Sequence, residues 1–291
     1  MYEKPYLIKE AKKELGLTEF RKRYRSIFGE KRLDFVRTLV LNVPYPCRAN
    51  CDYCIDKELR FHTITTNHWF KSLRLLFHTF PEVENVTITG GHVPFKTMRK
   101  ILNGIDNILA KPEITWNTSG INIDRDYRAF KDKLTHVNLH RNHFDDKRNQ
   151  EIFKTSYPII SIEEAKKIFG EKLSIRSVVD KNFDLDEYAK FGVPLFLNRL
   201  LPITDESDEL FDKVAEKLDG FYALDVRRRN AYMDTFYNGL PVRLGYGDTK
   251  VVHKPNREWL YLNVAILHRS GIISGTWYED DKVIYDGRQA Y

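Results

Sequence analysis

The sequence predicts an α/β protein built on a partial (β/α)6 TIM-like barrel with a parallel sheet. Amphipathic helical patterns separate its apolar, β-rich runs, and such alternation is typical of parallel βαβ units. Only six of these runs are found, whereas a closed barrel needs about eight. They lie at 35–43, 86–89, 114–117, 136–140, 173–179 and 193–200. A doubly wound open sheet is the alternative, and in both folds ligands collect at the carboxyl ends of the strands.

The helices are predicted from the spacing of apolar residues and from their end signals. We expect them at 69–78, 95–109, 125–133, 162–169 and 206–218. The helix at 162–169 has the clearest ends: Ser161 is a candidate N-cap, Glu164 completes a capping box, and Gly170 follows the last turn. Because each helix joins two strands, the connections are expected to be right-handed crossovers.

Two segments flank this repeating core, so we expect three parts: 1–34, 35–234 and 235–291. The first reads as a basic helical extension. The last reads as a small antiparallel β appendage, with a turn at 269–271. Its expected strands lie at 242–245, 259–267 and 272–277.

Composition limits the class of protein. The 291 residues are 42% hydrophobic and 30% charged, as in globular proteins. No apolar run approaches the ~20 residues that span a bilayer, and residues 1–16 carry no secretory signal, so we expect a cytoplasmic protein without a membrane partner. The net charge of +6 is compatible with a nucleotide, nucleic-acid or phosphorylated partner. Its patches at 9–25 and 227–229 are more commonly solvated helix faces.

The three cysteines of the chain, Cys47, Cys51 and Cys54, lie within eight residues directly after the first predicted strand. An odd number argues against a disulfide framework, and clustering indicates metal binding. A [4Fe–4S] cluster usually takes four thiolates, so three would leave one iron open to another ligand. Two alternatives remain: a non-catalytic zinc- or nucleic-acid-binding module with His62 as fourth ligand, and a lone C-x2-C redox motif.

This motif, C-x3-C-x-aromatic-C after a strand, resembles that of the radical S-adenosylmethionine superfamily, with Tyr53 as the aromatic residue. The resemblance implies that Cys47, Cys51 and Cys54 hold a [4Fe–4S] cluster whose open iron binds S-adenosylmethionine, with Tyr53 beside the adenine. It implies an enzyme in which one electron, from a donor such as flavodoxin or ferredoxin, cleaves S-adenosylmethionine. The resulting 5′-deoxyadenosyl radical would abstract hydrogen from a small-molecule, nucleotide or nucleic-acid substrate. Lack of a fourth cysteine restricts the resemblance to single-cluster members.

A second match lies at the end of the second predicted strand, where Gly90 and Gly91 resemble the Gly-Gly-Glu-Pro of the family. The resemblance implies that this glycine pair binds the methionine amino group. His92 and Val93 stand where the family has a single Glu, so no contact from an acidic side chain is carried over.

Polar residues near the ends of the later strands resemble the family more loosely. The resemblance extends over residues 35–200. It implies that the polar residues at the strand ends line one cofactor cavity. They are Ser119 after the third strand, Asn138 and His140 on the fourth, Arg176 on the fifth and Asn198 on the sixth.

Overall fold

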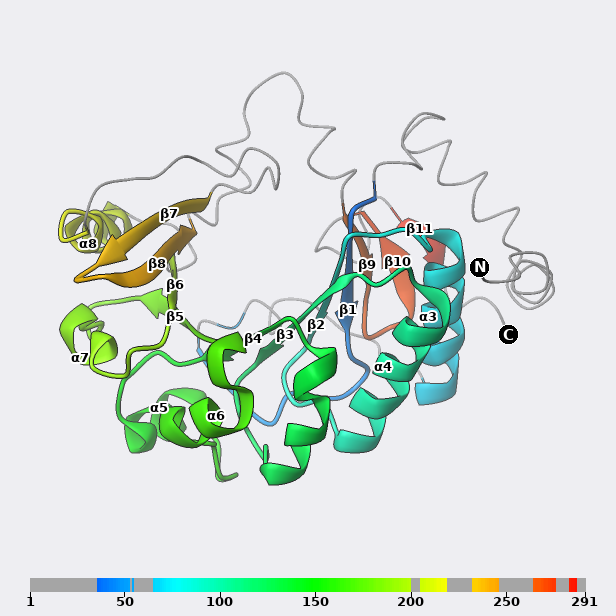
Figure 1. Ribbon diagram of the computed structural model, residues 1–291, viewed down its shortest axis with the longest axis horizontal. Helices are drawn as coiled ribbons and strands as arrows, with labels where there is room; N and C mark the ends of the chain where they lie inside the picture. The colour runs from blue at the N-terminus through cyan, green and yellow to red at the C-terminus, as the bar shows by residue number, and fades with distance from the viewer. Residues whose placement is uncertain are drawn as a thin grey trace, which may run out of the picture. The chain divides into compact units, whose positions relative to one another are not determined.

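The computed structural model describes residues 36–52, 54, 65–199, 205–218, 232–245, 264–275 and 283–286 (Figure 1). The expectations for 1–34, Tyr53, His62 and the arginine run at 227–229 lie outside these residues. The chain divides into two compact units. The described residues of the first fall within Met1–Pro46, Asp56–Trp116 and Asn256–Tyr291, and those of the second within Cys47–Ile55 and Asn117–Pro255.

The first unit has a parallel centre. Strands β1 (Thr38–Asn42), β2 (Asn85–Thr89) and β3 (Glu113–Thr118) run parallel, joined through α3 (Thr66–Thr79) and α4 (Phe95–Ile108). Leu39, Val40 and Leu41 are all buried, as expected of a strand covered on both faces. The indole N–H of Trp69 in α3 donates to the carbonyl of Asn42 at 3.1 Å, which fixes the helix at the carboxyl end of β1.

The C-terminal strands join this same unit. β9 (Val264–Leu267) pairs with β1 in parallel, on the side away from β2. β10 (Ile272–Ser274) pairs antiparallel with β9 and with β11 (Val283–Asp286). The sheet order of the unit is therefore β11-β10-β9-β1-β2-β3. The carboxyl ends of β9, β1 and β2 consequently lie along one edge.

The second unit repeats the pattern with β4 (His136–His140), β5 (Leu173–Val179) and β6 (Leu195–Arg199) in parallel. β8 (Leu240–Gly245) extends them in parallel, and β7 (Tyr232–Tyr237) closes the edge antiparallel to β8. The connections contain short helical elements. They are η3 (Arg125–Lys133), α5 (Asp146–Phe153), α6 (Ile162–Phe169), η4 (Gly170–Lys172), α7 (Leu185–Ala189) and α8 (Asp205–Ala215).

The predicted fold class is confirmed: the chain is α/β, with mostly parallel strands, intervening helices and a C-terminal antiparallel set. All six core strands lie where they were expected. The end signals of α6 are also confirmed, because the Ser161 hydroxyl accepts from the Glu164 N–H at 3.1 Å and Gly170 ends the helix at φ 62°. Among the described residues, no helix is both long and apolar enough to span a membrane.

Several details differ from expectation. The helix expected at 125–133 is a 3-10 helix, and α5, α7, β7 and β11 were not predicted. The C-terminal strands are not only antiparallel, since β8 and β9 each add to the parallel core strands β6 and β1. Of the strand expected at 259–267, the described part is Val264–Leu267. The three-part division at 34/35 and 234/235 remains a prediction.

Candidate functional site

The cysteine loop begins five residues after β1 and belongs to the second unit. Cys51 is buried, and Cys47 and Cys54 are half-buried. The N–H of Ala49 donates to Sγ of Cys47 at 3.4 Å, and the N–H of Cys54 donates to the carbonyl of Cys51 at 3.3 Å. The loop thus turns back on itself, and its first sulfur accepts a backbone hydrogen bond of the kind that tunes iron–sulfur sites.

The thiols suit an iron–sulfur cluster by their chemistry and by sharing one loop. Within the described ranges, however, no three His, Cys, Asp or Glu side chains are grouped closely enough to hold one metal ion. Metal ligands commonly converge only when the metal binds, because binding and local folding are coupled. By its chemistry the donor set therefore fits such a cluster.

The segment at the end of α5 holds this loop in place. Three contacts join them: the Arg48 guanidinium lies 4.4 Å from the centre of the Tyr157 ring, the Asn50 N–H donates to the Phe153 carbonyl at 2.7 Å, and Lys154 Nζ lies 2.6 Å from Asp52 Oδ1. The loop residues in these contacts, Arg48, Asn50 and Asp52, lie between the cysteines. The backbone between the cysteines is therefore held by contacts from the segment at the end of α5.

Gly90 and Gly91 form a turn after β2, both with positive φ (105° and 91°). Glycine is needed at the first position, because a Cβ there would clash with Asn42 Oδ1 and lie 2.9 Å from the backbone nitrogen of Val43. The turn is thus closely packed against the carboxyl end of β1. Both glycines lie in the first unit.

Arg269, just past β9, was not predicted as a site residue. Its side chain is buried, and the residue is 6% exposed. Nε donates to Asn42 Oδ1 at 3.2 Å, and Nη2 donates to the Gly90 carbonyl at 2.6 Å. Sequence reasoning assigned this residue to a turn of a separate appendage, and only the parallel pairing of β9 with β1 brings it to the glycine pair.

Four of the predicted residues lie on the half-buried side of the second unit's strands. Asn138 Nδ2 donates to Asn117 Oδ1 at 2.7 Å, and the Ser174 hydroxyl donates to Asn138 Oδ1 at 2.5 Å. Arg176 Nη2 donates to Asn198 Oδ1 at 3.2 Å. Arg176 is also the register partner of His140 on the neighbouring strand. The structure therefore brings Asn138, His140, Arg176 and Asn198 into one polar row across β4, β5 and β6.

His140 is held neutral in this row. Burial, together with the positive charges of Arg176 and Arg141, lowers its pKa to about 3. Its ring also lies against Phe153, at 6.0 Å between ring centres. A neutral imidazole offers one donor and one acceptor nitrogen, so His140 is suited to hydrogen bonding and not to supplying positive charge at neutral pH.

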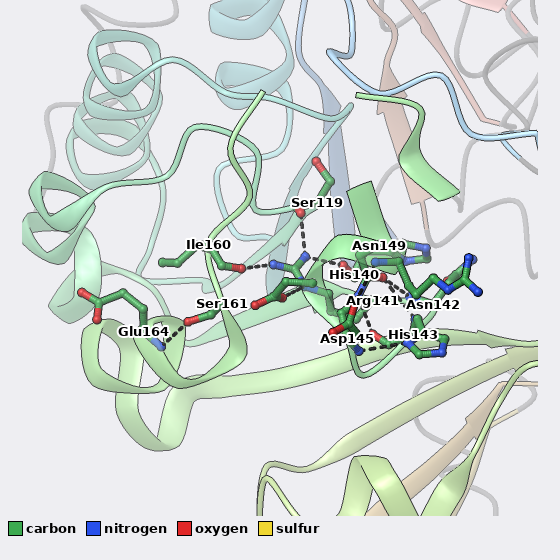
Figure 2. A network of polar contacts seen from close by, with 12 residues as sticks. Ser119, His140, Arg141, Asn142, His143, Asp145, Asn149, Ile160, Ser161 and Glu164 are labelled. Atoms are coloured by element: carbon green, nitrogen blue, oxygen red, sulfur yellow. Dashed lines mark hydrogen bonds and ion pairs between the residues drawn. The ribbon is translucent and has the colours of Figure 1, made fainter. Parts of the chain in front are cut away.

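Arg141 is the hub of the loops that follow β3 and β4, as Figure 2 shows. It is fully buried, and Nη1 donates to the carbonyls of Ser119 and His140, each at 2.7 Å. Nη2 donates to the carbonyl of Ile160, and Nε lies 3.8 Å from Asp146 Oδ1. One side chain thus satisfies backbone groups of three segments. Sequence reasoning passed over Arg141, because nothing local distinguishes a buried arginine from a surface one.

The predicted residue Ser119 is held by this hub through its carbonyl. Its hydroxyl oxygen is buried and has no hydrogen-bond partner among the residues that the structure describes. Buried polar groups are normally paired, so such a hydroxyl is a candidate for a ligand contact.

On the other side of the hub, Asn149 shapes the loop after β4. Its Oδ1 accepts from the N–H groups of Asn142 (3.0 Å) and His143 (3.1 Å), and its Nδ2 donates to the carbonyls of His143 and Asp145 (Figure 2). The loop is therefore fixed by one buried amide from α5.

Comparison with known proteins shows the fold. No protein-family model matches the chain, and no curated sequence matches it. Among solved structures it is similar to Streptococcus suis SuiB bound to S-adenosylmethionine, with a TM-score of 0.55 and 15% identity over 84% of this chain and 61% of that one. For SuiB bound to the precursor peptide SuiA, the TM-score is 0.55 and the identity 15%, over 88% of this chain and 63% of that one. For native anSMEcpe with bound AdoMet and Kp18Cys peptide, the TM-score is 0.50 and the identity 13%, over 87% of this chain and 78% of that one.

At this low identity the matches show the fold alone, which the chain shares with SuiB and anSMEcpe. The chain spans about three fifths of the length of the SuiB chains.

Proposed function

We propose that the protein is a radical S-adenosylmethionine enzyme with a single [4Fe–4S] cluster. The observation that carries this proposal is the C-x3-C-x2-C loop, which directly follows the first strand of a fold shared with S-adenosylmethionine-bound structures. A cluster held by these thiolates would supply the electron for reductive cleavage of S-adenosylmethionine to methionine and a 5′-deoxyadenosyl radical, which would take a hydrogen atom from the substrate.

The chain's own residues have binding and orienting roles in this proposal. The thiolates of Cys47, Cys51 and Cys54 bind the cluster, and the contacts from the end of α5 hold their loop. The Gly90–Gly91 turn, which has no side chains, lets the backbone approach the methionine end of S-adenosylmethionine closely.

The polar row of the second unit offers groups that suit a polar ligand such as S-adenosylmethionine. Arg176 offers a positive charge suited to a carboxylate, whereas neutral His140, Asn138, Asn198 and the unpaired Ser119 hydroxyl offer hydrogen bonds. Tyr53 would lie beside the adenine, as the resemblance implies.

The substrate is proposed only by class. The net charge of +6 favours a nucleotide or nucleic acid. A peptide is the second candidate, because SuiB is described with a precursor peptide and anSMEcpe with a peptide. Flavodoxin or ferredoxin in the cytoplasm is the proposed electron source.

Anaerobic reconstitution with iron and sulfide tests this proposal. We expect a brown protein with about four irons per chain that bleaches on dithionite reduction. Reduced protein given S-adenosylmethionine should then release 5′-deoxyadenosine and methionine, measured by mass spectrometry. A colourless protein that retains one zinc and releases no 5′-deoxyadenosine would instead support the zinc- or nucleic-acid-binding module.

A further inference from the structure

Arg269 connects the C-terminal strands to the glycine pair of the first unit. The parallel strands β9, β1 and β2 are consecutive neighbours in the sheet. Arg269 follows β9 by two residues, Asn42 ends β1, and Gly90 follows β2 directly. Neighbouring strands lie about 4.8 Å apart, so a side chain reaching from β9 past β1 to the turn after β2 must extend over roughly 10 Å. A long side chain with several donors is needed for that reach.

The backbone that carries Arg269 is itself fixed. In the turn between β9 and β10, the N–H of His268 donates to the Ile272 carbonyl at 2.8 Å, and the N–H of Gly271 donates to the His268 carbonyl at 3.0 Å. Nε2 of His268 lies 2.7 Å from the Ser274 hydroxyl, and both residues are fully buried. The guanidinium therefore projects from a rigid support.

One acceptor of its hydrogen bonds belongs to the glycine turn, and the other is the side chain that ends the neighbouring strand β1. Nη2 of Arg269 holds the Gly90 carbonyl at 2.6 Å, and Nε holds the Asn42 side chain against which Gly90 packs. Hydrogen bonds from a charged donor are about twice as strong as neutral ones. One buried cation thus holds both the Gly90 carbonyl and the Asn42 side chain that packs against Gly90.

We propose that Arg269 is a positioning residue, which holds the Gly90–Gly91 turn in the conformation that binds the methionine end of S-adenosylmethionine. This inference rests on the proposed function of the glycine pair. It makes the C-terminal strands part of the cofactor site, although the sequence placed them outside the core.

The test uses the full-length variants Arg269→Met and Arg269→Lys, with Arg37→Met as the matched control. Arg37 precedes β1 at the opposite end of the strand, where its exposed side chain lies 3.6 Å from Glu84. Hydrogen–deuterium exchange on the protein before reconstitution measures the turn directly. We expect the amides of residues 90–92 to exchange about tenfold faster in Arg269→Met than in the wild type. In Arg37→Met they should exchange at the wild-type rate.

Equilibrium binding of S-adenosylmethionine to the reconstituted proteins is the second readout. Losing a charged hydrogen bond to the turn should raise Kd about tenfold in Arg269→Met, with the iron content unchanged. Arg269→Lys keeps the charge but loses the forked geometry, so it should raise Kd about threefold.

The proposal would be overturned if both Arg269 variants kept the wild-type amide exchange rates in the turn and the wild-type Kd for S-adenosylmethionine. If Arg269→Met does not fold, Arg269→Lys decides on the same two measurements. A wild-type protein that assembles no cluster or binds no S-adenosylmethionine would contradict the proposed function, whereas the exchange comparison would still test the hold of Arg269 on the turn.

Discussion

Arg141 joins the end of β4 to the segments at Ser119 and Ile160 through backbone carbonyls, with the carboxylate of Asp146 beside its Nε. Replacing it by Met would leave these buried groups without their donor. We therefore expect Arg141→Met to lower the free energy of unfolding by about 3–5 kcal/mol, the usual effect of removing one partner from a buried charged network. Urea denaturation followed by circular dichroism measures this loss.

Arg148→Met is the matched control for this variant. Arg148 lies on the surface of α5, where it pairs with Glu151 at 2.7 Å. Exposed pairs contribute little, so the urea midpoint should not move. Equal midpoints for Arg141→Met and the wild type would contradict the role of Arg141 as a hub.

His140 makes the stability depend on pH. Its pKa is lowered from the ordinary histidine value of 6.5 to about 3 in the folded protein, first by burial and then by Arg176 and Arg141. Below pH 6.5 the unfolded chain therefore binds a proton that the native His140 does not. The contribution of His140 to the free energy of unfolding is fully present above pH 6.5 and is lost as the pH falls towards 3. The free energy of unfolding then changes with pH by at most about 1.4 kcal/mol per pH unit.

Unfolding free energies measured from pH 7 to 4 should show this slope in the wild type and a shallower one in His140→Gln. His136→Gln serves as the control, because His136 is exposed at the start of the same strand. Parallel pH profiles for the wild type and His140→Gln would show that the imidazole is not held neutral.

At the scale of elements, the turn after β3 depends on Gly120. Its φ is 75°, and a Cβ would lie 2.8 Å from the Leu139 side chain and 2.9 Å from that of Ile160. Gly239, between β7 and β8, has a similar φ of 79° but open space around it. Gly239→Ala should therefore cost about 1 kcal/mol of backbone strain, whereas Gly120→Ala should cost that plus about 1–3 kcal/mol of overpacking. Thermal unfolding distinguishes them, and equal shifts in Tm would contradict the packing argument.

The elements that sequence reasoning found are those with local signals. Buried residues are nearly continuous in β1 and alternate in β2, β3, β4 and β5, as is typical of strands, and α6 has a cap at each end. α5 was missed because Phe153 is its one buried apolar residue, so no helical period is visible, and α7 has only five residues. At 125–133 the two buried aromatics, Tyr127 and Phe130, are three residues apart, a spacing that suits 3-10 and α-helices alike.

In the whole molecule, the sequence predicted the cysteine loop, the glycine pair and the polar row, because each lies in or after a recognisable strand. It did not predict Arg269 or Arg141 as part of their surroundings. The reach of Arg269 depends on β9 pairing with β1 across more than 200 residues of chain, and no local pattern encodes such pairing. Arg141 was missed for the related reason that its burial is created by segments at Ser119 and Ile160.

If the three cysteines bind one [4Fe–4S] cluster, removing one thiolate should empty the site, and the iron content of Cys51→Ala measures this. Cys51 is the buried member of the motif, and Asn50→Ala is the control because it keeps the N–H that bonds to Phe153. After anaerobic reconstitution we expect about four irons per chain in the wild type and in Asn50→Ala. Cys51→Ala should hold less than one and release no 5′-deoxyadenosine, because two thiolates retain the cluster poorly. Wild-type iron content and S-adenosylmethionine cleavage in Cys51→Ala would contradict cluster binding by these three cysteines.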